Sequence, residues 1–350
     1  MDDLTALAGR VVGGEFLQRA ELLHALELSR ACATALFTVA DRVRRHFMGD
    51  AVTLCCIVPG RLGGCGEDCR WCSQSRLGPL GGEKPTRTPR ERIVAAARAA
   101  ARAGAGCLGI VNSGRRPGDG DLDDVIGAID AIRHDAQAQA AGPLRVCASL
   151  GELTPDQARR LARGGVFLVH HNLETSRRFF PSVVTTHTYD DRLATLRNAQ
   201  TAGMDVCSGG LLGLGETWED RVDLALTLRD VSPRVVPLNF LHPIPGTELE
   251  HQPPMEPMDI LRAVAMFRLA LPRADIKLCG GRVVNLRDMQ SWAFFAGASS
   301  LMTGDYLTTA GRSAQQDAQM IADAGMTLVT PRTGQSAAAP RTCFCTSAPR

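Results

Sequence analysis

Residues 144–157 read Leu-Arg-Val-Cys-Ala-Ser-Leu-Gly-Glu-Leu-Thr-Pro-Asp-Gln, a short apolar run followed by the start of a helix. The run has the length of a strand covered on both faces, where nearly every side chain is buried. Thr154 can cap a helix whose first residue is Pro155, and the Gln157 amide can return a hydrogen bond to the cap. The stretch therefore predicts a strand followed closely by a helix.

The same order of strand and helix recurs along most of the chain. Thr88-Pro89-Arg90-Glu91 offers a second helix start of this kind. Eight such units over about 270 residues match an α/β fold of the (β/α)8 TIM-barrel type, which typically needs ~250 residues. A doubly wound open sheet is the structural alternative. We predict the strands at residues 52–58, 107–112, 144–150, 166–172, 205–214, 235–241, 276–279 and 300–307.

The two ends of the chain differ from this repeat. Residues 1–47 are predicted to form an N-terminal helical layer, and residues 48–329 to form the barrel. Residues 330–350 are rich in Pro, Ser, Thr and Ala, which is typical of a disordered tail. The apolar residues placed at helical spacing in the N-terminal layer are Phe16, Ala20, Leu23 and Leu26.

The composition excludes several classes of protein. The 350 residues carry a formal net charge of +2, and 45% are hydrophobic and 22% charged. Neither sign of charge dominates, which argues against a nucleic-acid or membrane-surface partner. No apolar run is long enough for a transmembrane helix, and the acidic start Met1-Asp2-Asp3-Leu4 is not typical of a secretory signal. We therefore expect a cytoplasmic protein.

Twelve cysteines in such a chain suggest metal or cluster ligands rather than disulfides. Cys65, Cys69 and Cys72 follow the first predicted strand with the spacing C-x3-C-x2-C, at the face where TIM barrels place their sites. Three thiolates on one loop suit a 4Fe-4S cluster in which one iron has no protein ligand. That iron can bind S-adenosylmethionine (SAM). A zinc knuckle is the alternative, although zinc prefers four ligands.

Residues 65–75 read Cys-Gly-Glu-Asp-Cys-Arg-Trp-Cys-Ser-Gln-Ser, which resembles the cluster loop of the biotin synthase family of radical SAM enzymes. Further similar segments follow in order over roughly 260 residues, which is more than a shared barrel would produce. These segments are residues 146–151, 171–175, 185–189, 206–210, 236–240, 245–247 and 306–309.

The resemblance implies which residues bind the cofactors. Cys65, Cys69 and Cys72 would hold the 4Fe-4S cluster. Trp71 would support the adenine of SAM, and Glu174 would contact its ribose, with a side chain one methylene longer than the aspartate often found there. Radical chemistry carried by cofactors requires no catalytic amino acid in the usual sense.

Other positions are implied to face SAM and the substrate. Arg192 falls on a basic position that faces both, and Asn172 and Asn239 fall where the family hydrogen-bonds the substrate. Each has a plainer explanation, because Arg192 could belong to a surface ion pair and an inward asparagine could satisfy a backbone group. The segment implied to lie on the adenine side contains Gly209, Leu211 and Gly213.

The resemblance also implies an auxiliary iron–sulfur cluster, which has the 2Fe-2S form in the family. Cys107, Cys147 and Cys207 match its three cysteine ligands, but the family's arginine ligand is replaced by Lys277. Arginine and lysine are not equivalent ligands. Cys279 lies on the same side of its strand as Lys277, so it could supply a fourth thiolate and change the nuclearity of the cluster. The alternative is that Lys277 replaces the arginine.

The implied activity is a radical SAM sulfurtransferase that converts dethiobiotin to biotin, with sulfide from the auxiliary cluster as the sulfur source. A flavodoxin or ferredoxin electron donor and a homodimer are implied as well. One alternative is another radical SAM enzyme of the same clade, such as a metallocofactor maturase with a different substrate. A second is a non-catalytic metal- or cluster-binding protein.

Five cysteines receive no role from these arguments. Cys55 and Cys56 are adjacent on the first predicted strand, so only one of them can face the barrel interior. Cys32 is expected to pack in the N-terminal layer. Cys343 and Cys345 lie in the predicted tail.

Overall fold

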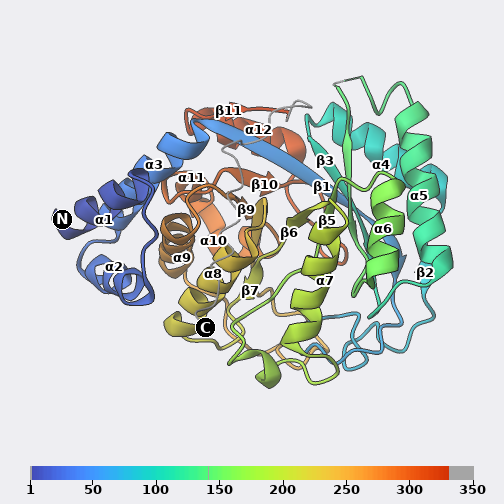
Figure 1. The fold of residues 1–350 in the computed structure, drawn as a ribbon, viewed down its shortest axis with the longest axis horizontal. Coiled ribbons are helices and arrows are strands. Elements are labelled where there is room, and N and C mark those ends of the chain that lie inside the picture. The colour runs from blue at the N-terminus through green and yellow to red at the C-terminus, as the bar shows by residue number, and fades with distance from the viewer. Residues whose placement is uncertain (1, 141, 331–350) are drawn as a thin grey trace, which may run out of the picture.

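The computed structural model describes residues 2–140 and 142–330, and its centre is a closed barrel of eight parallel strand positions (Figure 1). The barrel closes where Thr53 on the first strand pairs in parallel with Ser300 on the last. The predicted (β/α)8 barrel is confirmed, and the open-sheet alternative is wrong. The barrel strands are β1 (Ala51–Leu62), β3 (Cys107–Asn112), β4 (Arg145–Ser149), β5 (Leu168–His170), β6 (Asp205–Cys207) continued by β7 (Gly210–Leu212), β8 (Val235–Phe240), β9 (Asp275–Leu278) and β10 (Ser300–Met302).

The helices surround the barrel, and two short strands extend its first strand. β2 (Thr86–Arg87) pairs antiparallel with the end of β1, and β11 (Thr327–Leu328) pairs in parallel with its start. The helices are α4 (Arg90–Arg102), α5 (Asp119–His134), α6 (Pro155–Arg163), α7 (Tyr189–Thr201), α8 (Trp218–Val231), α9 (Pro257–Ala270), α10 (Arg282–Leu286), α11 (Trp292–Phe295) and α12 (Ala314–Asp323), with 3-10 turns η1 (Phe180–Ser182) and η2 (Arg287–Met289).

One predicted helix start is confirmed and the other is wrong in detail. The Thr154 hydroxyl accepts a hydrogen bond from the Gln157 backbone, and the Gln157 amide oxygen accepts one from the Thr154 backbone. At α4, by contrast, the capping position is Pro89, which has no side-chain cap to offer. The helix there begins one residue later than the capping pattern predicts.

Three helices precede the barrel and lie at one side of it in Figure 1. They are α1 (Asp2–Val12), α2 (Arg19–Ala31) and α3 (Ala33–Met48), and α3 packs against α9. The predicted apolar stripe is partly wrong, because Phe16 lies between two helices and is 54% exposed. The buried positions on α2 are Leu22, Ala25, Leu26 and Ser29.

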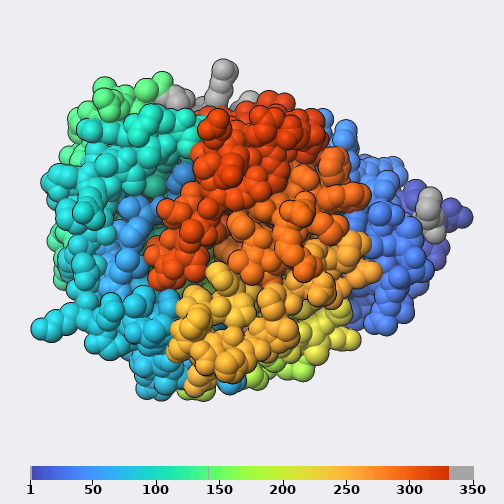
Figure 2. Space-filling view, turned by 180° about the vertical axis from the view of Figure 1, so that it is seen from behind, coloured from blue at the N-terminus to red at the C-terminus, as the bar shows by residue number. Residues whose placement is uncertain are grey.

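Figure 2 shows the molecule from behind, where the yellow-to-red second half of the chain covers the centre of the surface. It lies between cyan segments on one side and the blue N-terminal helices on the other. Within residues 2–140 and 142–330, no helix is both long enough and apolar enough to cross a bilayer. The predicted tail beyond Thr330, with Cys343 and Cys345, lies outside the described residues.

The predicted strand at 205–214 is split into β6 and β7 by a close approach of two backbones. A side chain at Gly209 would place its Cβ 1.9 Å from the carbonyl oxygen of Pro237 on β8. A Cβ on the next residue, Gly210, would lie 2.5 Å from the carbonyl oxygen of Glu174. Glycine is therefore required at both positions, and the chain bends between the two short strands.

The strand pairings determine which interior side chains lie at the same height. If the paired residues are followed from Cys55 once around the barrel, the path returns to β1 at a position eight residues away from Cys55. This offset is the stagger of the barrel. In barrels with this stagger, each interior layer takes four side chains from alternate strands. One layer therefore contains Cys55 on β1, Cys147 on β4, Cys207 on β6 and Lys277 on β9.

Candidate active site

A cavity of about 330 Å³ occupies the interior of the barrel towards the carboxyl ends of its strands. Trp71 and Cys72 line it from the loop after β1, and Tyr306 lines it from the segment after β10. Polar and sulfur-bearing side chains line its wall along the strands. They are Cys55, Cys147, His170, Asn172, Glu174, Cys207, Asn239, Lys277 and Cys279.

Cys65, Cys69 and Cys72 lie together on the loop that follows β1. The backbone N–H of Cys72 donates to the carbonyl of Cys69 at 3.0 Å, which makes the loop a tight turn. Burial raises the pKa of the Cys69 and Cys72 thiols, and the negative charge of a neighbouring cysteine raises it further. Three thiolates at this place thus require a compensating cation, and the irons of a cluster supply one.

The three cysteines form a donor set for a cluster rather than for a single metal ion. Among the residues that the structure describes, no group of three or more His, Cys, Asp or Glu side chains is arranged to hold a metal ion. The donor set of Cys65, Cys69 and Cys72 fits a cluster by its chemistry and its place on one loop.

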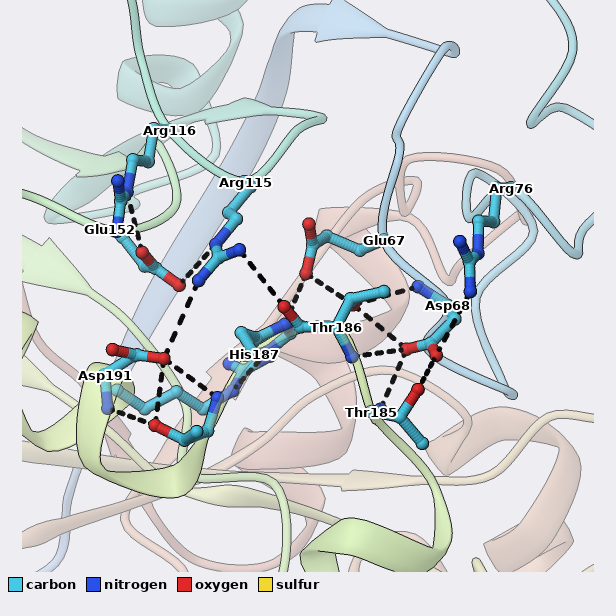
Figure 3. A network of polar contacts seen from close by, with 12 residues as sticks. Glu67, Asp68, Arg76, Arg115, Arg116, Glu152, Thr185, Thr186, His187 and Asp191 are labelled. Carbon is cyan, nitrogen blue, oxygen red and sulfur yellow. Dashed lines mark hydrogen bonds and ion pairs between the residues drawn. The ribbon is translucent and has the colours of Figure 1, made fainter.

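Asp68 anchors the loop to the segment before α7 (Figure 3). Its carboxylate accepts hydrogen bonds from the backbone N–H groups of Thr185 at 3.0 Å and Thr186 at 3.2 Å. Both threonine hydroxyls donate to it as well. Although burial acts against the charged form, these bonds lower the pKa of Asp68 to about 2. The loop between Cys65 and Cys69 is therefore held by an ionised, fully hydrogen-bonded carboxylate.

A chain of polar contacts leads from this loop to the cavity wall. Glu67 contacts Nδ1 of His187, and Arg192 donates through Nε to Nε2 of the same imidazole at 3.1 Å. Arg192 also donates through its guanidinium to the carbonyl oxygen of Asn172 at 2.9 Å. Its side chain is 10% exposed, so the surface ion pair considered for Arg192 is wrong.

Glu174 is a buried carboxyl group in an unusual backbone conformation. Its φ of 69° lies in the left-handed region, which non-glycine residues rarely adopt. The carboxylate lies 3.6 Å from Arg192 and accepts a hydrogen bond from the Asn172 amide at 3.3 Å. Burial raises the pKa of Glu174, while Arg192 and Asn172 oppose that rise. Backbone strain of this kind is often found where a site holds a ligand.

Asn172 and Asn239 line the cavity and also satisfy backbone groups. The side-chain oxygen of Asn172 accepts from the N–H of Gly209 at 3.2 Å. That of Asn239 accepts from the N–H of Gly280 at 3.0 Å, and its amide donates to the carbonyl of Gly210 at 3.3 Å. Both asparagine side chains thus satisfy neighbouring backbone groups, as the plainer explanation expects. An amide nitrogen carries two hydrogens, so each keeps capacity for a ligand.

The segment after β7 is held in a turn by an acid. The Glu216 carboxylate accepts from the backbone N–H groups of Gly213 at 2.9 Å and Leu214 at 2.7 Å, and from Arg221 Nε at 2.7 Å. Gly213 has a φ of 93°, which favours glycine. Leu211, just before this turn, lines the cavity.

Cys107, Cys147 and Cys207 lie on β3, β4 and β6 and face the barrel interior. The Cα atoms of Cys107 and Cys147 are 6.7 Å apart, and the structure joins their sulfur atoms as a disulfide. Cys207 is buried, with its sulfur 3.3 Å from Nδ1 of His170. The three sulfurs thus gather in one part of the interior, although iron could bind the first two only in the reduced form.

Lys277 and Cys279 lie on and just after β9, and both line the cavity. Burial acts to lower the pKa of Lys277, but the charges of the surrounding cysteines, Cys207 first, raise it. Burial raises the pKa of Cys279 to about 12. Both candidates for the fourth ligand position therefore face the same chamber, in agreement with the alternation along the strand.

Two residues in the cavity wall were not assigned by the sequence analysis. Cys55 faces the cavity whereas Cys56 packs against the outer core. His170 is the pairing partner of Cys207 on the neighbouring strand. Burial, followed by the nearby charge of Lys277, lowers the pKa of His170 to about 3, so its imidazole is neutral. The inward direction of Cys55 could have been found by extending the alternation from Cys107, its partner on β3.

Comparison with known proteins gives the family. Residues 61–228 match the Radical SAM superfamily, and residues 237–327 match the Biotin and Thiamin Synthesis associated domain. The biotin synthase of Geobacter sulfurreducens is 45% identical over 324 residues, which cover 92% of this chain and 97% of that protein. The biotin synthase of Geotalea uraniireducens is 44% identical over 321 residues, covering 91% and 96%.

The chain belongs to the biotin synthase family. Membership of this radical SAM family implies a 4Fe-4S cluster and SAM as cofactors. Among solved structures, HydG, a maturase of the FeFe-hydrogenase, superimposes with a TM-score of 0.79 at 17% identity, covering 94% of this chain and 76% of that chain. At that identity the likeness shows the fold alone.

The structure of this biotin synthase family member brings the predicted site residues to one cavity or its immediate wall. Six of the predicted residues do not line the cavity themselves but lie next to residues that do. They are Arg192, Gly209, Gly213, Cys65, Cys69 and Cys107. The individual roles of these residues in binding remain predictions.

Proposed function

We propose that this chain converts dethiobiotin to biotin by SAM-dependent radical sulfur insertion. The observation that carries the proposal is the placement of two cysteine groups on one cavity. Cys65, Cys69 and Cys72 lie on the loop at the carboxyl ends of the strands, and the inward cysteines of β3, β4 and β6 lie deeper. A substrate bound between them would reach both cofactors.

The residues around the first cofactor would hold and orient it. Cys65, Cys69 and Cys72 ligate the 4Fe-4S cluster, Trp71 supports the adenine, and Glu174 accepts hydrogen bonds from the ribose. Arg192 holds Glu174 and the backbone carbonyl of Asn172, two residues after strand β5, in place. Gly209, Leu211 and Gly213 form the adenine side. When bound, SAM and the clusters supply a 5′-deoxyadenosyl radical and the sulfur.

The rest of the cavity would bind the substrate and keep water away. Asn172 and Asn239 use their remaining amide hydrogens to bind polar groups of dethiobiotin, such as its cyclic urea. Apolar residues such as Ile57, Val111 and Leu168 complete the lining. A buried, largely apolar chamber protects a reactive carbon radical from solvent.

The auxiliary cluster would be held by Cys107, Cys147 and Cys207. For its fourth position the candidates remain a thiolate from Cys279, which would give an all-cysteine cluster, and the side chain of Lys277. Iron counting and Mössbauer spectra of Cys279→Ala against wild type test the first candidate. An unchanged auxiliary signal in that variant would rule Cys279 out.

The proposal includes partners and organisation. A flavodoxin or ferredoxin supplies the low-potential electron, and the protein acts as a homodimer in the cytoplasm, where reducing conditions keep cluster cysteines free. Residues 1–47 form a helical layer and residues 48–329 the catalytic barrel.

The test is anaerobic reconstitution with iron and sulfide, followed by dithionite, SAM and dethiobiotin, with mass spectrometry of the products. We expect biotin and 5′-deoxyadenosine from wild type and neither from Cys65→Ala. Cys32→Ser, at an exposed position, should match wild type. 5′-Deoxyadenosine without biotin would favour a radical enzyme with another substrate. Neither product from a well-reconstituted wild type would favour a non-catalytic cluster-binding protein.

A further inference from the structure

We infer that Cys55 supplies a thiolate ligand to the auxiliary cluster, completing a set of four with Cys107, Cys147 and Cys207. The inference rests on the proposed function, because it assumes that an auxiliary cluster is bound at those three cysteines. It assigns a ligand from β1, the strand that leads into the SAM-cluster loop.

The direction of the Cys55 side chain follows from its strand. Its pairing partner on β3 is Cys107, and its partner on β10 is Met302. Paired residues on neighbouring parallel strands point to the same side. Both Cys55 and Met302 line the cavity, and Cys56 packs on the other side of the strand. The thiol of Cys55 is therefore an interior group directly beside Cys107.

The height of Cys55 separates it from Cys279. With the eight-residue stagger, Cys55 lies in the same interior layer as Cys147, Cys207 and Lys277. Cys107 belongs to the adjacent layer below. Cys279 lies two residues beyond Lys277 along the chain, towards the carboxyl ends of the strands, where the backbone of Gly280 meets Asn239. Cys55 is thus at the level of Cys147 and Cys207 and one layer from Cys107, whereas Cys279 lies nearer the level of the Asn239 side chain.

The surroundings of Cys55 agree with a shared site. Cys55, Cys207 and Lys277 line the same cavity, so these three side chains share one interior space. The sulfur of Cys55 makes only a weak contact, 3.6 Å from the carbonyl oxygen of Cys56. No strong hydrogen bond among the described residues thus holds the thiol away from a metal.

Four cysteine thiolates are the number of protein ligands that a fully protein-bound iron–sulfur cluster requires. Four thiolates from β1, β3, β4 and β6 can bind the four irons of a cubane, one thiolate to each iron, or the two irons of a rhomb, two thiolates to each iron. Lys277, in the same layer, then faces the thiolates as an ammonium group. It would offset part of their negative charge and does not need to bind iron.

The experiment uses the full chain with Cys65, Cys69 and Cys72 replaced by alanine, so that only auxiliary iron is observed. In this parent we compare Cys55→Ser with Cys56→Ser, a matched control one residue away that faces the outer core. Each variant is reconstituted anaerobically with ⁵⁷Fe and sulfide. Iron retention against a chelator and the Mössbauer spectrum are then measured.

We expect Cys55→Ser to weaken iron retention by at least about tenfold and to change the spectrum, because even groups that only orient a metal ligand contribute about 10–100-fold to affinity. Cys56→Ser should match the parent. A Cys55→Ser sample with the parent's retention and spectrum would overturn the inference, and so would a change found in Cys279→Ser instead. To separate ligand loss from misfolding, the circular dichroism spectrum and the thermal unfolding midpoint of the iron-free Cys55→Ser variant are compared with those of the iron-free parent and should match them.

Failure of the proposed function gives a different result. If the parent itself retains no auxiliary iron, the assignment of Cys107, Cys147 and Cys207 fails, and the inference fails with it. If the parent binds iron and Cys55→Ser does not alter it, the function stands and only the role of Cys55 is removed.

Discussion

Arg192 donates a hydrogen bond through Nε to Nε2 of His187, and this contact fixes where His187 carries its proton. A guanidinium has no acceptor, so Nε2 must accept and the hydrogen must lie on Nδ1. Nδ1–H then donates to the Glu67 carboxylate. A neutral histidine therefore links an acid of the loop that carries Cys65, Cys69 and Cys72 to the arginine beside Glu174. Several measurable consequences depend on this link.

Replacing Arg192 by lysine should lower kcat/KM by about tenfold or more. A lysine ammonium cannot donate both to His187 and to the carbonyl of Asn172, and hydrogen bonds of charged groups are worth about 1.5–3 kcal/mol. Initial rates of 5′-deoxyadenosine formation at varied SAM concentration measure the effect. Arg197→Lys, on an exposed part of the same helix, serves as the control and should retain wild-type rates. Equal rates in both variants would contradict a supporting role of Arg192.

The neutral state of His187 predicts lower stability in mild acid. Burial, followed by the charge of Arg192, lowers the pKa of His187 in the folded protein. The unfolded chain then binds the proton more readily, so this contribution is complete above the ordinary pKa of about 6.5 and is lost as the pH falls towards the folded value. His187→Gln should show a smaller loss of unfolding free energy between pH about 7.5 and about 5.5. His251→Gln, at an exposed position, should retain the wild-type slope.

Gly209→Ala should destabilise the protein by about 3 kcal/mol, because the new methyl group would collide with the Pro237 carbonyl oxygen. Gly9→Ala is the matched control, since its Cβ would meet nothing within 4 Å and it lies within helix α1. That change should be neutral or add about 0.5–1 kcal/mol of stability. Chemical denaturation of both variants measures the difference. If Gly209→Ala and Gly9→Ala unfolded at similar denaturant concentrations, the backbones at Gly209 and Pro237 could move apart without loss of stability.

Arg282 and Asp317 form a fully buried ion pair at 2.5 Å that ties α10 to α12. Arg282→Met should cost up to about 3–5 kcal/mol, because the buried Asp317 carboxylate then keeps only the partly exposed Arg312, at 3.3 Å, as a cationic partner. The double variant Arg282→Met with Asp317→Leu should recover much of that loss, since neither charge then remains. Thermal unfolding of both variants and wild type gives the comparison. A double variant less stable than the single one would refute this account.

Much of the fold could be predicted because each strand carries its own signal. The run at 107–112 coincides with β3, and the run at 144–150 extends one residue beyond β4 at each end. The break between β6 and β7 could not be predicted, since it arises from contact of Gly209 with a strand that lies far along the chain. The exposed position of Phe16 was missed for a similar reason, because the start of α2 depends on how the three helices pack.

The sequence predicted which residues belong to the candidate site, but it did not predict at which height in the barrel each side chain lies. The cysteine spacing indicates a cluster loop, and the resemblance supplies the candidates on the strands. The stagger of the barrel is a property of all eight pairings together, and no local pattern contains it. Cys55 and His170 were left without roles because their inward direction depends on pairings with other strands, Cys55 with Cys107 and His170 with Cys207.

Strand β11 pairs with the first two residues of β1, and Thr330 donates through its hydroxyl to the carbonyl of Gly104. The described part of the chain therefore ends beside the amino ends of the barrel strands, whereas the loop that carries Cys65, Cys69 and Cys72 lies at their carboxyl ends. An affinity tag or a fluorescent fusion joined after Thr330 would leave the entrance for cofactor and substrate clear.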